Sequence, residues 1–224
     1  MECVDADQVA ALRTLLARTR WLERARLFGR ALRVSTRAPG GLLLVGTPSY
    51  EPWHLTAHLD EEARLSGLPW LTPTLVRWSP PPDAPPHLRV GLARLEAAQR
   101  GETLFVVTED TAPVPLLERV NDARRVGATI LALEGGVDRE LEGLAHEALA
   151  LPSSADASPA DEAELAGRMG LLTFDAAQHL VSAAAGERDA PDAGGIRGQD
   201  GRRGGKSLRD RVAKLLDIVS GPRA

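Results

Sequence analysis

The stretch GETLFVVTEDTAPVPLLERVNDARRVGATILALEGG, residues 101–136, decides the fold. Two continuous apolar runs, 103–107 and 128–133, frame a segment whose apolar residues recur at helical spacing over 116–126. Strands that are apolar along their whole length are typical of a parallel sheet covered on both faces, because a half-exposed strand would alternate with polar residues. The stretch therefore predicts a strand–helix–strand unit of an α/β fold.

The same alternation of strands and helices runs along most of the chain. Apolar runs at 42–45, 71–78 and 148–151 predict three further strands. Segments with a helical pattern precede, separate and follow these runs, at 5–36, 53–65, 88–100, 139–146 and 158–185. The expected fold is a doubly wound α/β domain, a parallel five-stranded sheet flanked by helices, over residues 1–186. In such folds ligands bind at the carboxyl ends of the strands.

The C-terminal part of the chain has a different composition. Residues 187–205 are rich in Gly, Asp and Arg and contain almost nothing apolar, which predicts a disordered, flexible linker. Residues 206–220 then form an amphipathic pattern that predicts a short C-terminal helix with one apolar face. We expect this helix to dock into a groove of a protein partner, with folding back onto its own domain as the alternative.

Composition excludes several classes of protein. The chain has 224 residues, of which 43% are hydrophobic, and its single cysteine, Cys3, excludes an intramolecular disulfide and a cysteine-rich zinc module. The acidic segment 1–8 lacks the pattern of a signal peptide, and no apolar stretch approaches the roughly 20 residues that span a bilayer. The net charge of −4 makes nucleic acid an unexpected partner. We expect a cytoplasmic protein without membrane association.

The order of these segments resembles the SIS (sugar isomerase) domain family. Four stretches carry the likeness: GGLLLVGTPS at 40–49, the strand–helix–strand unit at 101–136, LEGLAHEALALPSS at 141–154 and FDAAQHL at 174–180. The resemblance implies a divergent SIS-like domain with a phosphosugar or related anionic ligand, held by hydroxyl and backbone N–H groups at the strand ends. The matching ligand-binding positions are Thr47, Ser49, Thr108, Thr111, Ser153 and Ser154.

The turns of this chain depart from the family pattern in ways that oppose a phosphate. Pro48 has no N–H to donate, and Glu51 and Asp110 bring negative charge to the first and second turns. A carboxylate about 4 Å from a phosphate costs on the order of 1–4 kcal/mol. We expect a regulatory or sensor domain rather than a strongly catalytic one, and these turns favour the first of two alternatives over the second. The alternatives are a ligand-free oligomeric scaffold that acts as a protein-interaction module and, second, a phosphosugar isomerase.

An aldose–ketose isomerase would need a base with a pKa near neutral beside the substrate carbonyl. Glu62 and His58 are the first candidates for this role, and Glu51 and His179 are others. Nothing in the sequence distinguishes one of them as the base.

Histidine spacing raises the possibility of a metal site. His58 and Glu62 are four residues apart, on one face of a helix, as are His54 and His58. The heptose-phosphate isomerase branch of the family implies a zinc site with a His–Glu pair of this spacing and ligands from the C-terminal helix, where His179 is the candidate. Gln178 and His179 are adjacent, so both cannot face one metal. We expect the polar face of an interfacial helix without a cofactor, with zinc as the alternative.

The first predicted helix suggests self-association. Trp21 and Phe28 form a second apolar seam, apart from the seam that contains Leu12 and Leu16. A second seam on one helix often packs against another subunit. The sequence therefore predicts a homodimer or homotetramer.

Overall fold

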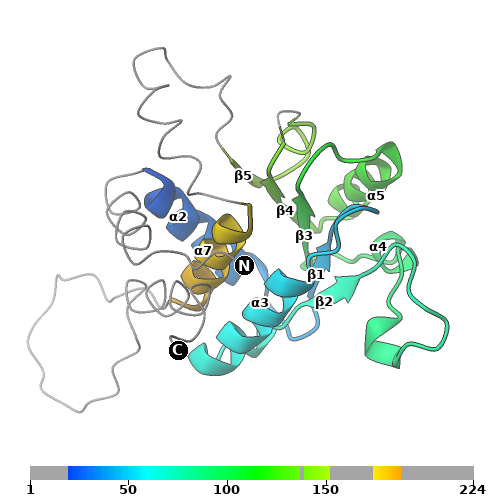
Figure 1. Ribbon diagram of the computed structural model, residues 1–224, viewed down its shortest axis with the longest axis horizontal. Coiled ribbons are helices and arrows are strands. Elements are labelled where there is room, and N and C mark those ends of the chain that lie inside the picture. Colours follow the sequence, from blue (N-terminus) through cyan, green and yellow to red (C-terminus); the bar gives the residue numbers. More distant parts are fainter. Residues whose placement is uncertain (1–19, 137–138, 152–173, 188–224) are drawn as a thin grey trace, which may run out of the picture.

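Five parallel strands form the centre of the molecule, in the order β2-β1-β3-β4-β5 (Figure 1). The computed structural model describes residues 20–136, 139–151 and 174–187, without the side chains of residues 20–22. The strands are β1 (Leu42–Val45), β2 (Thr74–Val76), β3 (Thr103–Thr108), β4 (Thr129–Glu134) and β5 (Glu147–Ala150). The predicted α/β fold with a parallel five-stranded sheet is confirmed.

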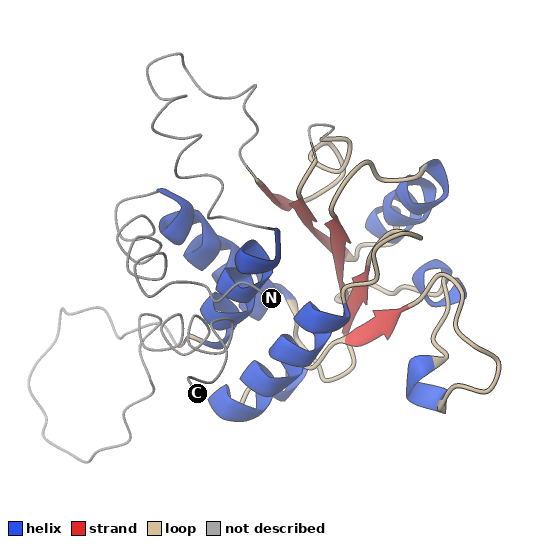
Figure 2. Cartoon of the chain, in the orientation of Figure 1, coloured by secondary structure: helices blue, strands red, loops and turns tan. Residues whose placement is uncertain are grey.

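Helices cover both faces of this sheet, as the continuous apolar strands require (Figure 2). One face carries α2 (Arg20–Ser35), α3 (Trp53–Ser66) and α7 (Phe174–Gly186), and the other carries α4 (Ala93–Glu96) and α5 (Val114–Arg125). Successive strand residues face alternate cores: Phe105 and Val107 pack toward α2, α3 and α7, whereas Leu104 and Val106 pack toward α4 and α5. Each such side chain contributes about 1.5–3 kcal/mol when fully buried.

The winding direction reverses between β1 and β3. From β1 the chain passes through α3 to β2 on one side, and later strands build outward from β3 on the other side. The loops that follow β1 and β3 therefore diverge at the carboxyl edge of the sheet. This reversal is the place where open α/β sheets bind their ligands.

Helices α2 and α7, from the two ends of the described chain, pack at unusually close range. A Cβ atom at Gly29 of α2 would lie 2.6 Å from the backbone of Ala184, so only glycine allows this approach. The guanidinium of Arg33 donates to the carbonyl oxygens of Ala184 (3.1 Å) and Glu187, which caps the C-terminal end of α7. This contact fixes where α7 lies relative to the sheet.

Three predicted elements differ in the structure. The helix predicted at 88–100 is reduced to α4 and a 3-10 turn, η2 (Pro86–Leu88), because the prolines and Gly91 interrupt it. The helix predicted at 139–146 is a series of turns around Gly143. The strand predicted at 71–78 is confined to β2, since Pro69 starts a 3-10 turn, η1 (Pro69–Leu71), that takes up its beginning.

The second apolar seam of the first helix is not separate from the core. Phe28 is 3% exposed, packs on Phe105 with a ring-centroid distance of 5.3 Å, and belongs to the same core as Leu32. The placement of Phe28 on an outer seam was wrong, because α2 is buried along the stripe that includes both residues. The predicted homodimer or homotetramer loses this support and stays a prediction.

Several predicted features lie outside the described residues. They are the first part of the N-terminal helix, the beginning of the helix predicted at 158–185, the linker at 187–205 beyond Glu187, and the terminal helix at 206–220. These features, and the division of the chain that rests on them, stay predictions. Within the described ranges, no helix combines the length and the apolar character that crossing a bilayer would need.

Candidate functional site

The turn that follows β1 closes on itself. The N–H of Thr47 donates to the carbonyl oxygen of Tyr50 (2.9 Å), and the N–H of Tyr50 donates to the Thr47 hydroxyl oxygen (3.1 Å). The hydroxyls of Thr47 and Ser49 lie 3.1 Å apart and share a hydrogen bond. A Cβ atom at position 46 would lie 1.9 Å from the Tyr50 carbonyl oxygen, so Gly46 is required. Both hydroxyls that were predicted to hold a ligand are engaged within their own turn.

The next carboxylate, Glu51, is paired rather than open to the site. Its Oε2 atom accepts from the guanidinium of Arg77 (2.9 Å) and from the indole N–H of Trp53 (3.0 Å). The same guanidinium lies 4.6 Å from the centre of the Trp53 ring, in cation–π range. Arg77, which directly follows β2, therefore neutralises much of the charge that Glu51 brings to this edge.

The ends of β3 and β4 carry two buried polar side chains. Thr108 and Glu134 are register partners in the sheet, and each is 1% exposed. Glu134 Oε1 accepts from the N–H of Leu141 (3.2 Å), whereas Glu134 Oε2 and Thr108 Oγ1 have no hydrogen-bond partner in the described structure. Burial raises the pKa of Glu134 above its usual value, and the hydrogen bond from Leu141 opposes this shift.

The loops after β3 and β4 lie against each other. A Cβ atom at Gly135 would lie 2.8 Å from the carbonyl oxygen of Glu109, and one at Gly136 would lie 3.2 Å from the backbone of Asp110. Glu109, Asp110 and Thr111 are exposed at this edge.

Of the six predicted ligand-binding residues, the structure places four at the carboxyl edge: Thr47, Ser49, Thr108 and Thr111. The other two, Ser153 and Ser154, lie outside the described residues.

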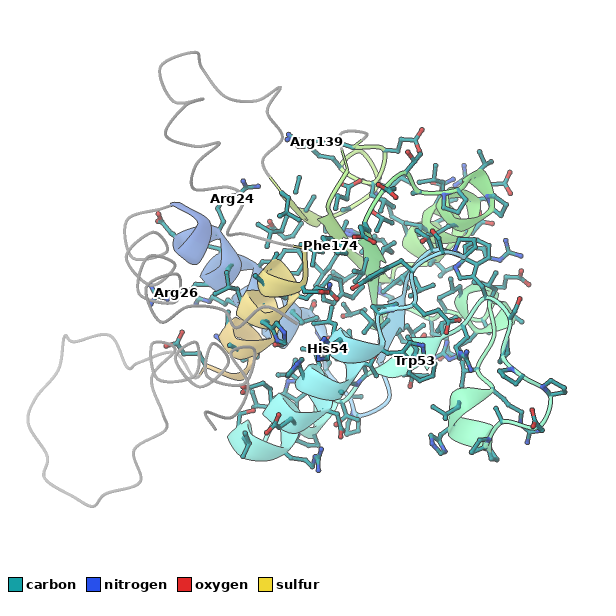
Figure 3. All side chains as sticks on the ribbon, in the orientation of Figure 1. Arg24, Arg26, Trp53, His54, Arg139 and Phe174 are labelled. Carbon is teal, nitrogen blue, oxygen red and sulfur yellow. The ribbon has the colours of Figure 1, made fainter. Side chains whose placement is uncertain are left out.

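A polar network joins the β1 turn to the start of α7. The amide nitrogen of Gln178 donates to the Tyr50 hydroxyl oxygen (2.6 Å) and to Asp175 Oδ1 (3.2 Å), and the Tyr50 hydroxyl donates to the same Asp175 oxygen (3.4 Å). The ring of Phe174, at the start of α7, packs edge-on against Tyr50 at 5.4 Å between centroids. The N-terminal end of α7 therefore lies over the carboxyl edge, as Figure 3 shows for Phe174.

Three histidines meet where α3 passes α7. His54 and His58 are one turn apart on α3 with ring centroids 4.9 Å apart, and His179 of α7 lies 5.1 Å from His54 and 4.2 Å from His58. Figure 3 shows His54 on the α7 side of α3 and Trp53 on another side of that helix. One nitrogen from each ring lies within 4.8 Å of the other two.

The environment of His58 and His179 favours neutral imidazole rings. Burial lowers the pKa of His58, and the neighbouring His54 lowers it further. Burial, followed by the charges of His58 and His54, lowers the pKa of His179 to about 4. Neutral rings keep a lone pair on one nitrogen.

Glu62 lies away from the sheet edge. It follows His58 by one turn, nine residues after Trp53, or about 14 Å along the helix axis. The structure thus brings His58 and His179 together, as the metal hypothesis requires, but with His54 as the third member of the group in place of Glu62.

Four contributors to the site were not among the predicted ligand-binding residues. Tyr50 offered a signal, since it is the only tyrosine in the chain and lies in the turn five residues after an apolar strand ends. Glu134 closes an apolar strand, which is also visible in sequence. The pairing of Arg77 with Glu51 and of Gln178 with Tyr50 depends on contacts 26 and 128 residues apart, which no local pattern reveals.

No protein-family model and no curated protein sequence matches this chain. The solved structures that are similar to it include the following two. One, from Silicibacter pomeroyi DSS-3, is described as a candidate phosphosugar isomerase; it is 16% identical over 96% of this chain and 53% of its own, with a TM-score of 0.49. The other, from Salmonella typhimurium LT2, is described as a candidate sugar-binding protein; it is 13% identical over 80% of this chain and 46% of its own, with a TM-score of 0.46. The chain therefore spans about half the length of each.

Proposed function

We propose that this chain is a divergent SIS-like domain that binds a sugar-type ligand, a phosphosugar or its uncharged sugar, at the carboxyl ends of β1, β3 and β4. Its role would be that of a regulatory or sensor domain rather than an efficient isomerase. The observation that carries this proposal is the pair of buried, unpartnered oxygens of Thr108 and Glu134. An unpaired buried polar group costs about 1–3 kcal/mol, and a ligand hydroxyl that pairs with it recovers that cost.

The charges at the carboxyl edge of the sheet determine whether the phosphate or the sugar hydroxyls of such a ligand contribute more to its affinity. Helices α3 and α5 both begin here without a side-chain cap, and N–H groups at a helix start can bind an anion. Several of these groups are already used, since the Trp53 N–H donates to the Glu51 carbonyl oxygen (2.8 Å) and the Leu116 N–H donates to the Pro113 carbonyl oxygen (2.8 Å). In addition, the exposed carboxylates of Glu109 and Asp110 oppose a phosphate by about 1–4 kcal/mol each at about 4 Å. We therefore expect the sugar hydroxyls to contribute more of the affinity than the phosphate.

The position of the candidate bases supports binding over strong catalysis. Glu62 lies about 14 Å along α3 from its first residue. His58 packs among the other two histidines of the cluster. A general base must come within about 3 Å of the proton that it removes, or reach it through one water. Thr108 and Glu134 face the α4 and α5 side of the sheet, whereas α3 covers the opposite face. Neither Glu62 nor His58 therefore lies beside them.

One observation favours the ligand-free scaffold as the second candidate. The hydroxyls of Thr47 and Ser49 satisfy each other within their turn, so this turn needs no ligand to complete its hydrogen bonds. In that case self-association and a protein partner for the C-terminal helix would carry the function. A homodimer or homotetramer by light scattering, together with no response to any sugar, would support this candidate.

A thermal-shift comparison of paired ligands tests the proposal. Fructose 6-phosphate, glucose 6-phosphate and the two free sugars are each titrated against the full chain. A ligand at 100 times its Kd should add about 2.7 kcal/mol to the free energy of unfolding. The shift should disappear in Thr108→Val and persist in the control Thr129→Val, which makes the same change at the amino end of β4. If none of the four compounds shifts the melting temperature, the ligand-free scaffold replaces the sugar-binding proposal.

A further inference from the structure

The histidine cluster contains buried ring nitrogens whose hydrogen-bonding capacity is not satisfied. The Nε2 atom of His58 and the Nδ1 atom of His179 are buried and have no hydrogen-bond partner in the described structure. Buried ring nitrogens are normally paired, because leaving one unpaired costs about as much as a lost hydrogen bond. Ring stacking alone does not remove that cost, although the His58 and His179 rings do meet edge-to-face at 71°. Something that accepts electron pairs from nitrogen would complete this group.

We propose that His54, His58 and His179 form a binding site for a divalent transition-metal ion, with Zn²⁺ as the ion of best fit. The proposal is independent of the sugar-type ligand. It rests on three imidazoles from two helices whose nitrogens lie within 4.8 Å of one another.

The chemistry of the donors selects the ion. Imidazole nitrogen suits zinc, copper and nickel, whereas calcium and magnesium require sets of oxygen ligands. At a Zn–N distance of about 2.0–2.1 Å, tetrahedral ligands lie about 3.3 Å apart. The observed limit of 4.8 Å means that the rings need to approach by roughly 1.5 Å at most, within the reach of side-chain rotation. Three protein ligands leave one position of a tetrahedral ion for water or another ligand.

The two helices hold the ligands in place independently of a metal. His54 and His58 lie four residues apart on one face of α3, the spacing that lets two ring nitrogens reach one ion. His179 is presented by α7, which the Gly29 contact and the Arg33 cap fix against α2. The site therefore depends on how α7 docks, and not on a flexible loop.

An acidic side chain of α7 adds negative charge near the cluster. Asp175 lies one turn before His179 on α7, and its charge acts on the His179 ring. Its Oδ1 atom is held by Gln178 and Tyr50. This negative charge favours a bound cation at the cluster.

The test measures zinc directly on the full, untagged chain. The protein is equilibrated with excess Zn²⁺, dialysed and analysed for its metal content, and zinc affinity is measured by calorimetric titration. We expect about one zinc ion per chain, and a loss of affinity of at least about 10- to 100-fold in His58→Gln and in His179→Gln. His87→Gln, which changes an exposed histidine elsewhere, is the matched control and should bind zinc as the unchanged chain does.

A second variant keeps the test decisive if the partly buried positions disturb folding. His54 is exposed, so His54→Gln should fold normally and still bind zinc much more weakly. Zinc far below one equivalent after equilibration would overturn the proposal and leave a bridging water as the partner of the two buried nitrogens. Stoichiometric zinc that His54→Gln and His58→Gln leave unchanged would overturn it as well. Thr108→Val changes the proposed sugar site but not the histidine cluster, so it should still bind zinc. This variant therefore distinguishes a failure of the zinc proposal from a failure of the sugar-binding proposal.

Discussion

The carboxyl ends of β1 and β3 are neighbours in the sheet, yet they differ in whether their polar groups form hydrogen bonds. After β1, the hydroxyls of Thr47 and Ser49 and the N–H of Tyr50 bond to one another in a closed turn. At the end of β3, the Thr108 hydroxyl is buried beside Glu134 without a hydrogen-bond partner among the described residues. The hydroxyls of the first turn are therefore engaged within the structure, and the proposed binding site depends instead on the end of β3, where fewer hydroxyls are visible in the sequence.

The largest effect is expected from Gly46→Ala, which attacks the closed turn. A methyl group 1.9 Å from the Tyr50 carbonyl oxygen forces the turn open, so the free energy of unfolding should fall by about 3 kcal/mol or more. Urea denaturation measures this loss. Gly91→Ala, where the nearest atom lies 3.8 Å from the new methyl, is the control and should change stability little. Equal effects of the two variants would contradict the description of a closed turn.

Thr47→Val should destabilise the protein by about 1–2 kcal/mol. The substitution keeps the shape of the side chain but removes the oxygen that accepts from the Tyr50 N–H and pairs with Ser49. The same urea experiment measures the change. An unchanged midpoint would mean that the hydrogen bonds of the Thr47 hydroxyl carry no stability.

Thr108→Val should have a smaller effect, of the opposite sign. In the absence of ligand the substitution removes a buried hydroxyl without a partner, so the free energy of unfolding should stay constant or rise by up to about 1 kcal/mol. Chemical denaturation of Thr47→Val and Thr108→Val side by side is the most direct test of the difference between the two strand ends. A clear loss of stability in Thr108→Val would show that this hydroxyl has a partner after all.

The smallest effect is expected from Glu134→Gln, and it should depend on pH. Burial raises the folded-state pKa of Glu134, so the folded protein holds this proton more tightly than the unfolded chain does. The stability that this proton provides is present below the unfolded-state pKa, near 4.5, and is lost as the pH rises through the folded-state value. The melting temperature of Glu134→Gln relative to the unchanged protein should therefore increase from pH 4 to neutral pH. Parallel melting curves across this range would rule out the raised pKa.

The strands were predictable because burial on both faces leaves a continuous apolar run that needs no tertiary information. β3 and β4 appear in the structure almost as the sequence predicts, and β2 is only shortened. The prediction of a helix over 88–100 was wrong. Gly91 pairs with Arg77 in an isolated bridge beside the sheet, and the spacing of apolar residues does not reveal such a pairing. Local turns, not helical hydrogen bonds, satisfy the backbone there.

The candidate site was predictable only in its local parts. The spacing of His54 and His58 on one helix face is visible in sequence, and so is a threonine at the end of a strand. That His179 completes the cluster, and that Arg77 neutralises Glu51, depends on which helices and strands the fold brings together. Sequence periodicity determines the face on which a residue lies but not the residue that it meets.

The close contact of α2 with α7 has a consequence for the order of events during synthesis. Arg33 and Ala184 are 151 positions apart, so the emerging chain must wait for nearly the whole domain before this contact can form. Contacts between distant parts of a chain form late and slow folding. The sheet can assemble first on the ribosome, but His179 and Gln178 arrive only with the last described helix. A polypeptide released before α7 has emerged would carry most of the fold and neither of these two side chains.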